Sequence, residues 1–353
     1  MNKIIKTLFI KPSQPFSGEA TLNLNRVIGN KLAGIETTLI LDTNILIQME
    51  HVVKNGNRRS LLRMHGLQNL IEFISRCPAQ SICLSPGQSL YEMPPPLAER
   101  AREAFDAFCD VHLPGFVDAP NGIRTKFDGP EARYGYFNLP YDIQAIFGVT
   151  FTSLLLLQII DRSSIKAPID KFKEYLRRVV EEIDLLSEKE IEIAKYCYAV
   201  PPSNCRDLIN FRKGIRANFL QKKDGKLPVS AEEAFAVAFN GARDLYLLNA
   251  ANVSDSNGLD GVPQDCWIAT QDKKLAAFSK MVHNVNINGE AGKYSAVVRP
   301  PESKEDEYWL MADTEHHSLA LGRSVHHRQR TVEFEKYVQA AHRVAEEVRG
   351  LMP

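Results

Sequence analysis

Two aspartates stand just after apolar segments that are far apart in the chain. Asp42 directly follows the apolar run at residues 38–41, and Asp272 follows the run at residues 266–270 after one intervening residue. Continuous apolar runs of this length are typical of strands buried on both faces of a parallel sheet. Ligands of open α/β sheets bind outside the carboxyl ends of the strands. We therefore expect both carboxylates at a functional edge if the two strands are neighbours. The alternative is that each Asp only caps the following helix.

Two further acids complete a pattern that resembles a known family. Glu92 follows a strand candidate at residues 80–85, and Asp244 lies in a helix predicted over residues 231–253. LILDTNILI followed much later by IATQDKKL resembles a PIN-like ribonuclease domain, and Glu92 and Asp244 match the second and third acids of that family. The resemblance implies a Rossmann-like three-layer α/β/α core with a parallel sheet. It also implies that Asp42, Glu92, Asp244 and Asp272 together bind divalent metal.

Such an acidic cluster suits phosphodiester hydrolysis. Mg²⁺ or Mn²⁺ prefers carboxylate oxygens and can activate water and stabilise the phosphate and leaving group. Asn44 and Thr270 would hold the carboxylates or a phosphate oxygen from just outside the metal site. Asn240 lies four residues before Asp244 on the same helix face and would orient a metal-bound water or the substrate. The simpler interpretations are turn chemistry for Asn44 and a solvent-facing side chain for Asn240.

A basic helix is predicted at residues 205–223. Between residues 203 and 226 seven Lys or Arg stand against two Asp, an excess of five. Arg212, Lys213 and Arg216 are our candidates for guiding RNA phosphates toward the acids. The formal net charge of the chain is zero, so any nucleic-acid contact must be local. The alternative is an ordinary solvated helix face.

Composition indicates a soluble globular protein, and the resemblance implies a PIN-like domain at residues 38–298. The chain has 353 residues, 24% charged and 44% hydrophobic. We expect an N-terminal extension at 1–37, a helical insertion at about 97–229 and a C-terminal tail and helix at 299–353. Residues 299–330, with the His316-His317 and His326-His327 pairs, are expected to be irregular. The apolar run at residues 147–160 is too short and polar to span a bilayer, and it predicts a buried core helix.

The six cysteines form no CxxC pair and no zinc spacing, which favours a reducing cytoplasm. The sequence thus predicts a cytoplasmic, metal-dependent endoribonuclease acting on single-stranded or structured RNA, with a toxin or defence effector as one setting. A homo-oligomer or a regulatory protein partner fits the long insertion. The alternative is a catalytically silent PIN-like RNA- or protein-binding scaffold. A HAD-type phosphatase is less favoured because Asn44 stands where a second Asp is needed, and a 5′-nuclease lacks its helix-hairpin-helix pattern.

Overall fold

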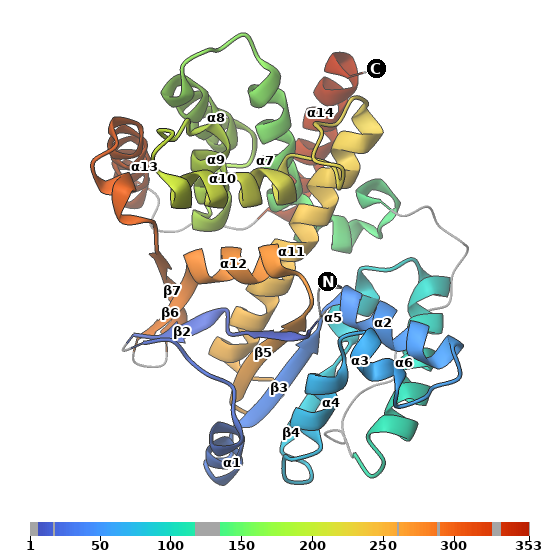
Figure 1. Cartoon of the computed structure of the whole chain (residues 1–353). Helices are drawn as coiled ribbons and strands as arrows, with labels where there is room; N and C mark the ends of the chain where they lie inside the picture. The colour runs from blue at the N-terminus through green and yellow to red at the C-terminus, as the bar shows by residue number, and fades with distance from the viewer. Residues whose placement is uncertain are drawn as a thin grey trace. The chain divides into compact units, whose positions relative to one another are not determined.

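A computed structural model describes residues 6–16, 18–116, 135–259, 261–287, 290–326 and 333–352 of the chain. The chain divides into two compact units. Unit 1 comprises Met1–Tyr134 and Leu247–Val297, and unit 2 comprises Gly135–Tyr246 and Val298–Pro353. Helix α11 (Ala231–Asn257) contributes residues to both units. Figure 1 shows the elements of each unit.

Unit 1 is a mixed α/β unit built on a four-stranded sheet. The strands are β1 (Leu8–Ile10), β5 (Gln264–Thr270), β3 (Glu36–Leu41) and β4 (Ile82–Ser85), in that order. The central strand β3 runs parallel to β4 and β5, whereas β1 is antiparallel to β5. The expectation of a wholly parallel sheet is therefore wrong at one edge, because a three-residue N-terminal strand pairs there.

The helices of unit 1 lie between and after its strands in the chain. They are α1 (Leu24–Leu32), α2 (Thr43–Lys54), α3 (Leu61–Met64), α4 (Gln68–Ile74), α5 (Gly87–Tyr91), α6 (Pro95–His112) and α12 (Lys273–Met281). The core joins Leu39 and Leu41 of β3 to Ile45 and Met49 of α2 and to Phe108 of α6, all fully buried. This packing fixes α2 directly behind the end of β3.

A smaller three-stranded sheet completes unit 1. It has the order β2-β6-β7, with β2 (Ser13–Pro15) parallel to β6 (Val282–Ile287) and β6 antiparallel to β7 (Glu290–Val297). Residues 1–37, expected to be an extension, thus contribute strands to both sheets of unit 1.

Unit 2 is helical in its described residues. Besides its part of α11, it holds α7 (Tyr141–Arg162), α8 (Pro168–Glu182), α9 (Glu188–Tyr198), α10 (Arg206–Phe219), α13 (Glu307–His326), α14 (Phe334–Leu351) and the short turns η1 (Tyr136–Asn138) and η2 (Pro301–Lys304). Helix α14 packs closely on α7, where a Cβ added to Gly148 would lie 3.1 Å from Tyr337. The region 299–353, expected to be a tail, therefore belongs to the body of unit 2.

Two of the expected features of unit 2 have clear outcomes. Helix α7 is, among the described helices, the one long and apolar enough to cross a membrane, and 78% of its most apolar window is buried inside the protein. That burial is typical of a core helix, as predicted. The expectation that residues 299–330 are irregular is wrong, because α13 covers most of them and buries His316. His327 and residues 328–330 lie outside the described residues.

Candidate functional site

The carboxyl ends of β3 and β5 lie side by side. Leu41 of β3 is in register with Ala269 of β5, and the next residue, Asp42, donates its backbone N–H to the Ala269 carbonyl at 3.0 Å. The two strands are therefore neighbours in the sheet, which is the condition for Asp42 and Asp272 to lie at the same edge. The two segments are more than 220 residues apart in sequence and meet only because the sheet pairs them.

The Asp42 side chain is oriented by two neighbours. Oδ2 of Asp42 accepts hydrogen bonds from the Asn44 Nδ2 and the Thr270 Oγ1. Asp42 occupies the position before α2, but its side chain makes no capping hydrogen bond. The capping alternative therefore does not explain Asp42. Asn44 and Thr270 hold its carboxylate, as the sequence predicts for these two side chains.

Asn44 and Thr270 are themselves fixed by the strand end. Asn44 Nδ2 lies 3.1 Å from Thr270 Oγ1, and Asn44 Oδ1 accepts the backbone N–H of Gln271 at 2.9 Å. Thr270 Oγ1 accepts the backbone N–H of Asp272 at 2.9 Å, and the Thr270 residue is fully buried. A buried and interlinked polar network of this kind holds its members rigidly.

Glu92 joins this network through Thr43. Glu92 ends α5, is 5% exposed, and its Oε2 accepts from the Thr43 Oγ1 at 3.1 Å. Ser89 of the same helix donates from Oγ to the Leu41 carbonyl at 2.7 Å, which ties α5 to the end of β3. The Glu92 carboxylate is thus buried beside Thr43, the residue that follows Asp42. Burying a carboxylate costs free energy, so packing alone does not explain Glu92 at this position.

Asp272 has a structural role at the start of α12. Its Oδ1 accepts the backbone N–H groups of Lys274 at 2.6 Å and Leu275 at 3.0 Å, which is helix N-capping. The capping interpretation therefore holds for Asp272. Its main chain still lies at the same strand end as Asp42, because its N–H binds Thr270.

Asp244 lies in unit 2, in the part of α11 that precedes the division. Its Oδ2 accepts a hydrogen bond from the Asn218 Nδ2 of α10 at 2.9 Å. Asn240, one turn earlier, is exposed. The structure brings Asp42, Glu92 and the Asp272 main chain together in unit 1, and it describes Asp244 and Asn240 within unit 2.

The side-chain atoms of Asp42 and Glu92 that could bind a metal ion are all carboxylate oxygens. Within the described residues, no three His, Cys, Asp or Glu side chains gather as a metal-ligand group. Mg²⁺ is often held by only one or two carboxylates with waters completing its shell. The chemistry of Asp42 and Glu92 therefore fits Mg²⁺ or Mn²⁺ better than a softer metal, which would need Cys or His ligands.

The basic helix α10 offers fewer accessible charges than its sequence suggests. Arg216 pairs with Asp161 at 3.1 Å and donates to the Cys197 carbonyl at 2.7 Å. Burial lowers the pKa of Arg212, whose Nε is buried without a hydrogen-bond partner among the described residues. Lys213 is exposed. Of the three residues proposed to guide RNA, Lys213 is exposed, whereas Arg212 and Arg216 are partly buried.

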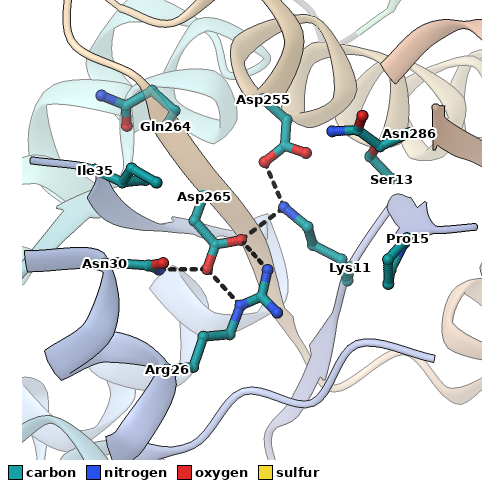
Figure 2. Close-up of a pocket in the computed structure, with 10 residues that line it drawn as sticks. All are labelled: Lys11, Ser13, Pro15, Arg26, Asn30, Ile35, Asp255, Gln264, Asp265 and Asn286. Carbon is teal, nitrogen blue, oxygen red and sulfur yellow. Dashed lines mark hydrogen bonds and ion pairs between the residues drawn. The ribbon is translucent and has the colours of Figure 1, made fainter. Parts of the chain in front are cut away.

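A second polar site of unit 1 lies at the opposite end of β5. Asp265 accepts two hydrogen bonds from Arg26, at 2.7 and 2.8 Å, and lies 2.8 Å from Lys11, which also pairs with Asp255 (Figure 2). Burial alone would raise the pKa of Asp265, but the hydrogen bonds and charges of Arg26 and Lys11 hold it well below its usual range. A cavity of about 340 Å³ adjoins these side chains.

This second site is separate from the Asp42 site. Asp265 is the second residue of β5 and Thr270 the last, so about 16 Å of strand lies between them at ~3.3 Å per residue. The charges of Asp265, Lys11, Arg26 and Asp255 balance one another. We therefore interpret this cluster as an ion-pair network that anchors the N-terminal segment to the sheet.

Some contributors to the site are visible only in the structure. Thr43 directly follows Asp42 in the sequence, and only the structure shows that its hydroxyl links Glu92 to the Asp42 strand end. No sequence pattern points to Ser89. It lies three residues before Glu92 on the short helix α5, and its hydroxyl is directed at the end of β3. No protein-family model matches the chain, and neither a curated protein nor a solved structure is significantly similar to it.

Proposed function

We propose that this chain is a metal-dependent endoribonuclease with a PIN-like, Rossmann-like α/β/α core. The observation that carries the proposal is the Asp42 carboxylate, which sits at the carboxyl end of adjacent parallel strands and makes no cap. Asn44 and Thr270 both donate to it. An ion ligand must be held in one orientation by such neighbours.

Asp42 and Glu92 would hold the Mg²⁺ or Mn²⁺. The bound ion would supply an activated water and charge relief at the scissile phosphate. Asn44 and Thr270 keep the Asp42 carboxylate oriented, and Thr43 does the same for Glu92. Because Glu92 and Thr270 are buried, little rearrangement of these groups is required when the ion binds.

Asp272 and Asp244 have secondary places in this proposal. Asp272 caps α12 and would contact the ion through a water molecule rather than directly. Asp244 is assigned by the family resemblance alone, Asn240 by its position four residues before Asp244 on the same helix face, and Arg212, Lys213 and Arg216 by the positive charge of their helix. The order of elements supports the resemblance, because β3, β4 and β5 run parallel with an acid after each.

Location and partners are also part of the proposal. All six cysteines are free thiols, which supports a reducing cytoplasmic setting. The helical unit 2 separates Glu92 from Asp272 in the chain and supports a regulated enzyme, such as a toxin or defence effector. A homo-oligomer or a regulatory protein would then bind unit 2.

Cleavage of labelled RNA with Mg²⁺ or Mn²⁺ tests the proposal. Wild type should cut RNA and lose activity with EDTA, whereas Asp42→Asn and Glu92→Gln should lose at least about 100-fold. Glu103→Gln is the matched control, because it removes an exposed carboxylate of α6 and should leave cleavage unchanged. EDTA-sensitive cleavage by Asp42→Asn at the wild-type rate would refute the assignment.

The second candidate function is a PIN-like scaffold that binds RNA or protein without cutting. The capping role of Asp272 and the Asn218 contact of Asp244 favour it, because both acids already have structural partners. A scaffold would bind RNA in the presence of metal and leave every RNA offered intact. Tight binding without cleavage by the wild-type protein therefore decides for the scaffold.

A further inference from the structure

Residues 51–71 form a segment without any acidic residue. It contains Lys54, Arg58, Arg59 and Arg63 and no Asp or Glu. It spans the end of α2, the loop to α3, and α3 itself up to the middle of α4. We call it the acid-free segment. A run of this kind in a chain of zero net charge is a local concentration of positive charge.

Three of its four exposed cations have no acidic partner among the described residues. Arg58, Arg59 and Arg63 are exposed, and none of them forms an ion pair with another described residue. Lys54 differs, since it pairs with Glu50 one turn earlier on α2. An exposed arginine without an acidic partner offers its full set of donors to phosphate oxygens.

The acid-free segment is joined to the Asp42 site by one face of α2. Asn44, Gln48 and His51 recur at helical spacing on that face, and Asn44 is the residue that donates to Asp42. The distance along the helix from Asn44 to His51 is about 10 Å at ~1.5 Å per residue. A stacked nucleic-acid strand carries one phosphate about every 3.4 Å, so this path spans roughly three phosphates.

His65 fixes the loop beside this face. Its Nδ1 lies 2.7 Å from Gln48 Oε1, its ring contacts the His51 ring at 5.9 Å, and its carbonyl accepts from the Gln271 side chain at 2.8 Å. Gln271 also contacts Asn44 through its backbone. Burial, and then the nearby His51, lower the pKa of His65. His65 therefore fixes the position of the loop, and the permanent positive charge of the segment comes from its Lys and Arg side chains.

We propose that single-stranded RNA leaves the Asp42 site along this face of α2 and that Arg58, Arg59 and Arg63 bind its phosphates. The exposed His51 ring offers a surface on which a base can stack. The proposal rests on the nuclease proposed above and moves the RNA surface from α10 to unit 1. Helix α10 presents Lys213 to solvent, but Arg216 is committed to Asp161 and the Arg212 Nε is buried.

Binding of labelled single-stranded RNA of about twelve nucleotides tests the proposal. The parent protein is Asp42→Asn, which prevents cleavage during the measurement. Fluorescence anisotropy is recorded between about 50 and 200 mM salt. The test variant adds Arg58→Gln, Arg59→Gln and Arg63→Gln. The control variant instead adds Lys166→Gln, Lys223→Gln and Lys226→Gln, three exposed lysines of unit 2.

The arginine variant should bind about tenfold or more weakly at low salt. Its plot of log affinity against log salt should be shallower by about 2, since each lost phosphate contact on a single strand contributes ~0.7. The lysine variant should match the parent. Thermal unfolding of both variants checks that they fold, and the exposed positions make a large change unexpected.

The outcomes separate this proposal from the nuclease. Equal RNA binding by the arginine variant and the parent, or a loss confined to the lysine variant, overturns the RNA path. Absence of RNA binding by the parent itself also overturns it, whether or not wild type cuts RNA. If the arginines govern binding but wild type with Mn²⁺ never cuts RNA, the path stands and the nuclease proposal fails.

Discussion

At the scale of single residues, the account depends on the orientation of the Asp42 carboxylate. The Thr270 hydroxyl donates to Asp42 and accepts from the Asp272 N–H. Thr270→Val keeps the shape of the side chain but removes both interactions. Removing a group that orients a metal ligand typically reduces activity by about 10–100-fold. Thr270→Ser keeps the hydroxyl and should retain most activity.

Rates of RNA cleavage by the two Thr270 variants, measured at equal metal concentration, check this prediction. The lost hydrogen bonds should also lower the free energy of unfolding of Thr270→Val by about 1–3 kcal/mol. Cleavage by Thr270→Val at the wild-type rate would show that the orientation of Asp42 does not matter for the reaction.

The Asp265 network makes a prediction about stability alone. Asp265 is 4% exposed and balances Arg26 and Lys11. Asp265→Asn leaves two cations with one acid, and breaking a buried pair in this way costs about 3–5 kcal/mol. Urea unfolding measures the loss, with the exposed Asp110→Asn as the control. A change below about 0.5 kcal/mol, typical of surface substitutions, would contradict a structural role for this cluster.

At the scale of elements, helix α12 begins on the Asp272 cap, and two substitutions separate this role from catalysis. Asp272→Ser keeps a capping oxygen and loses the charge, whereas Asp272→Ala loses both. Loss of a cap costs about 1 kcal/mol, so only Asp272→Ala should be clearly less stable. If Asp272 acts on a metal-bound water, both variants should lose RNA cleavage. Full activity of Asp272→Ser would leave Asp272 with the capping role alone.

The sequence predicts the elements whose own residues determine them. The buried strands β3 and β5 and the core helix α7 are confirmed, because their apolar runs are long enough to signal burial. The edge strand β1 has three residues and forms only by pairing with β5. The short β2 likewise depends on β6. Such strands are fixed by tertiary partners and leave no periodic signal of their own.

The candidate site shows the same limit. Asp42, Asn44 and Thr270 were predictable, because a polar residue after a buried strand is visible in the sequence. The partnership of Glu92 with Thr43 depends on where α5 ends, which single-residue patterns do not specify. Whether an Asp caps a helix or faces a ligand is decided by one side-chain rotation. The sequence shows the same pattern at Asp42 and Asp272, and in the structure the Asp272 side chain caps its helix whereas the Asp42 side chain does not.

At the scale of the whole molecule, the chain passes from unit 1 to unit 2, back to unit 1 and then again to unit 2. Residues 299–353 join unit 2, where His316 of α13 lies among charged groups. Burial, and then the charge of Lys195, lower the pKa of His316 to about 4. The charged and titratable groups that face it are Lys195, Glu188, Arg299, Asp313 and His317.

This shift predicts how stability depends on pH. In the unfolded chain His316 is protonated near its ordinary pKa of 6.5, whereas in the folded chain its pKa is about 4. The free energy of unfolding should therefore fall as pH decreases from about 6.5 to 4, by roughly 2–4 kcal/mol from this group. His316→Gln should remove that part of the dependence. Identical pH profiles of unfolding for the two proteins would contradict the prediction.

The central claim is that Asp42 and Glu92 hold a divalent cation at the carboxyl end of β3. A crystal of the wild-type protein soaked in Mn²⁺ tests it most directly, because Mn²⁺ gives an anomalous signal. We expect a peak at about 2.0–2.2 Å from an oxygen of Asp42 and of Glu92, and no such peak in a soaked Asp42→Asn crystal. A peak only elsewhere, or none at Asp42 under conditions in which the protein cuts RNA, would contradict the account.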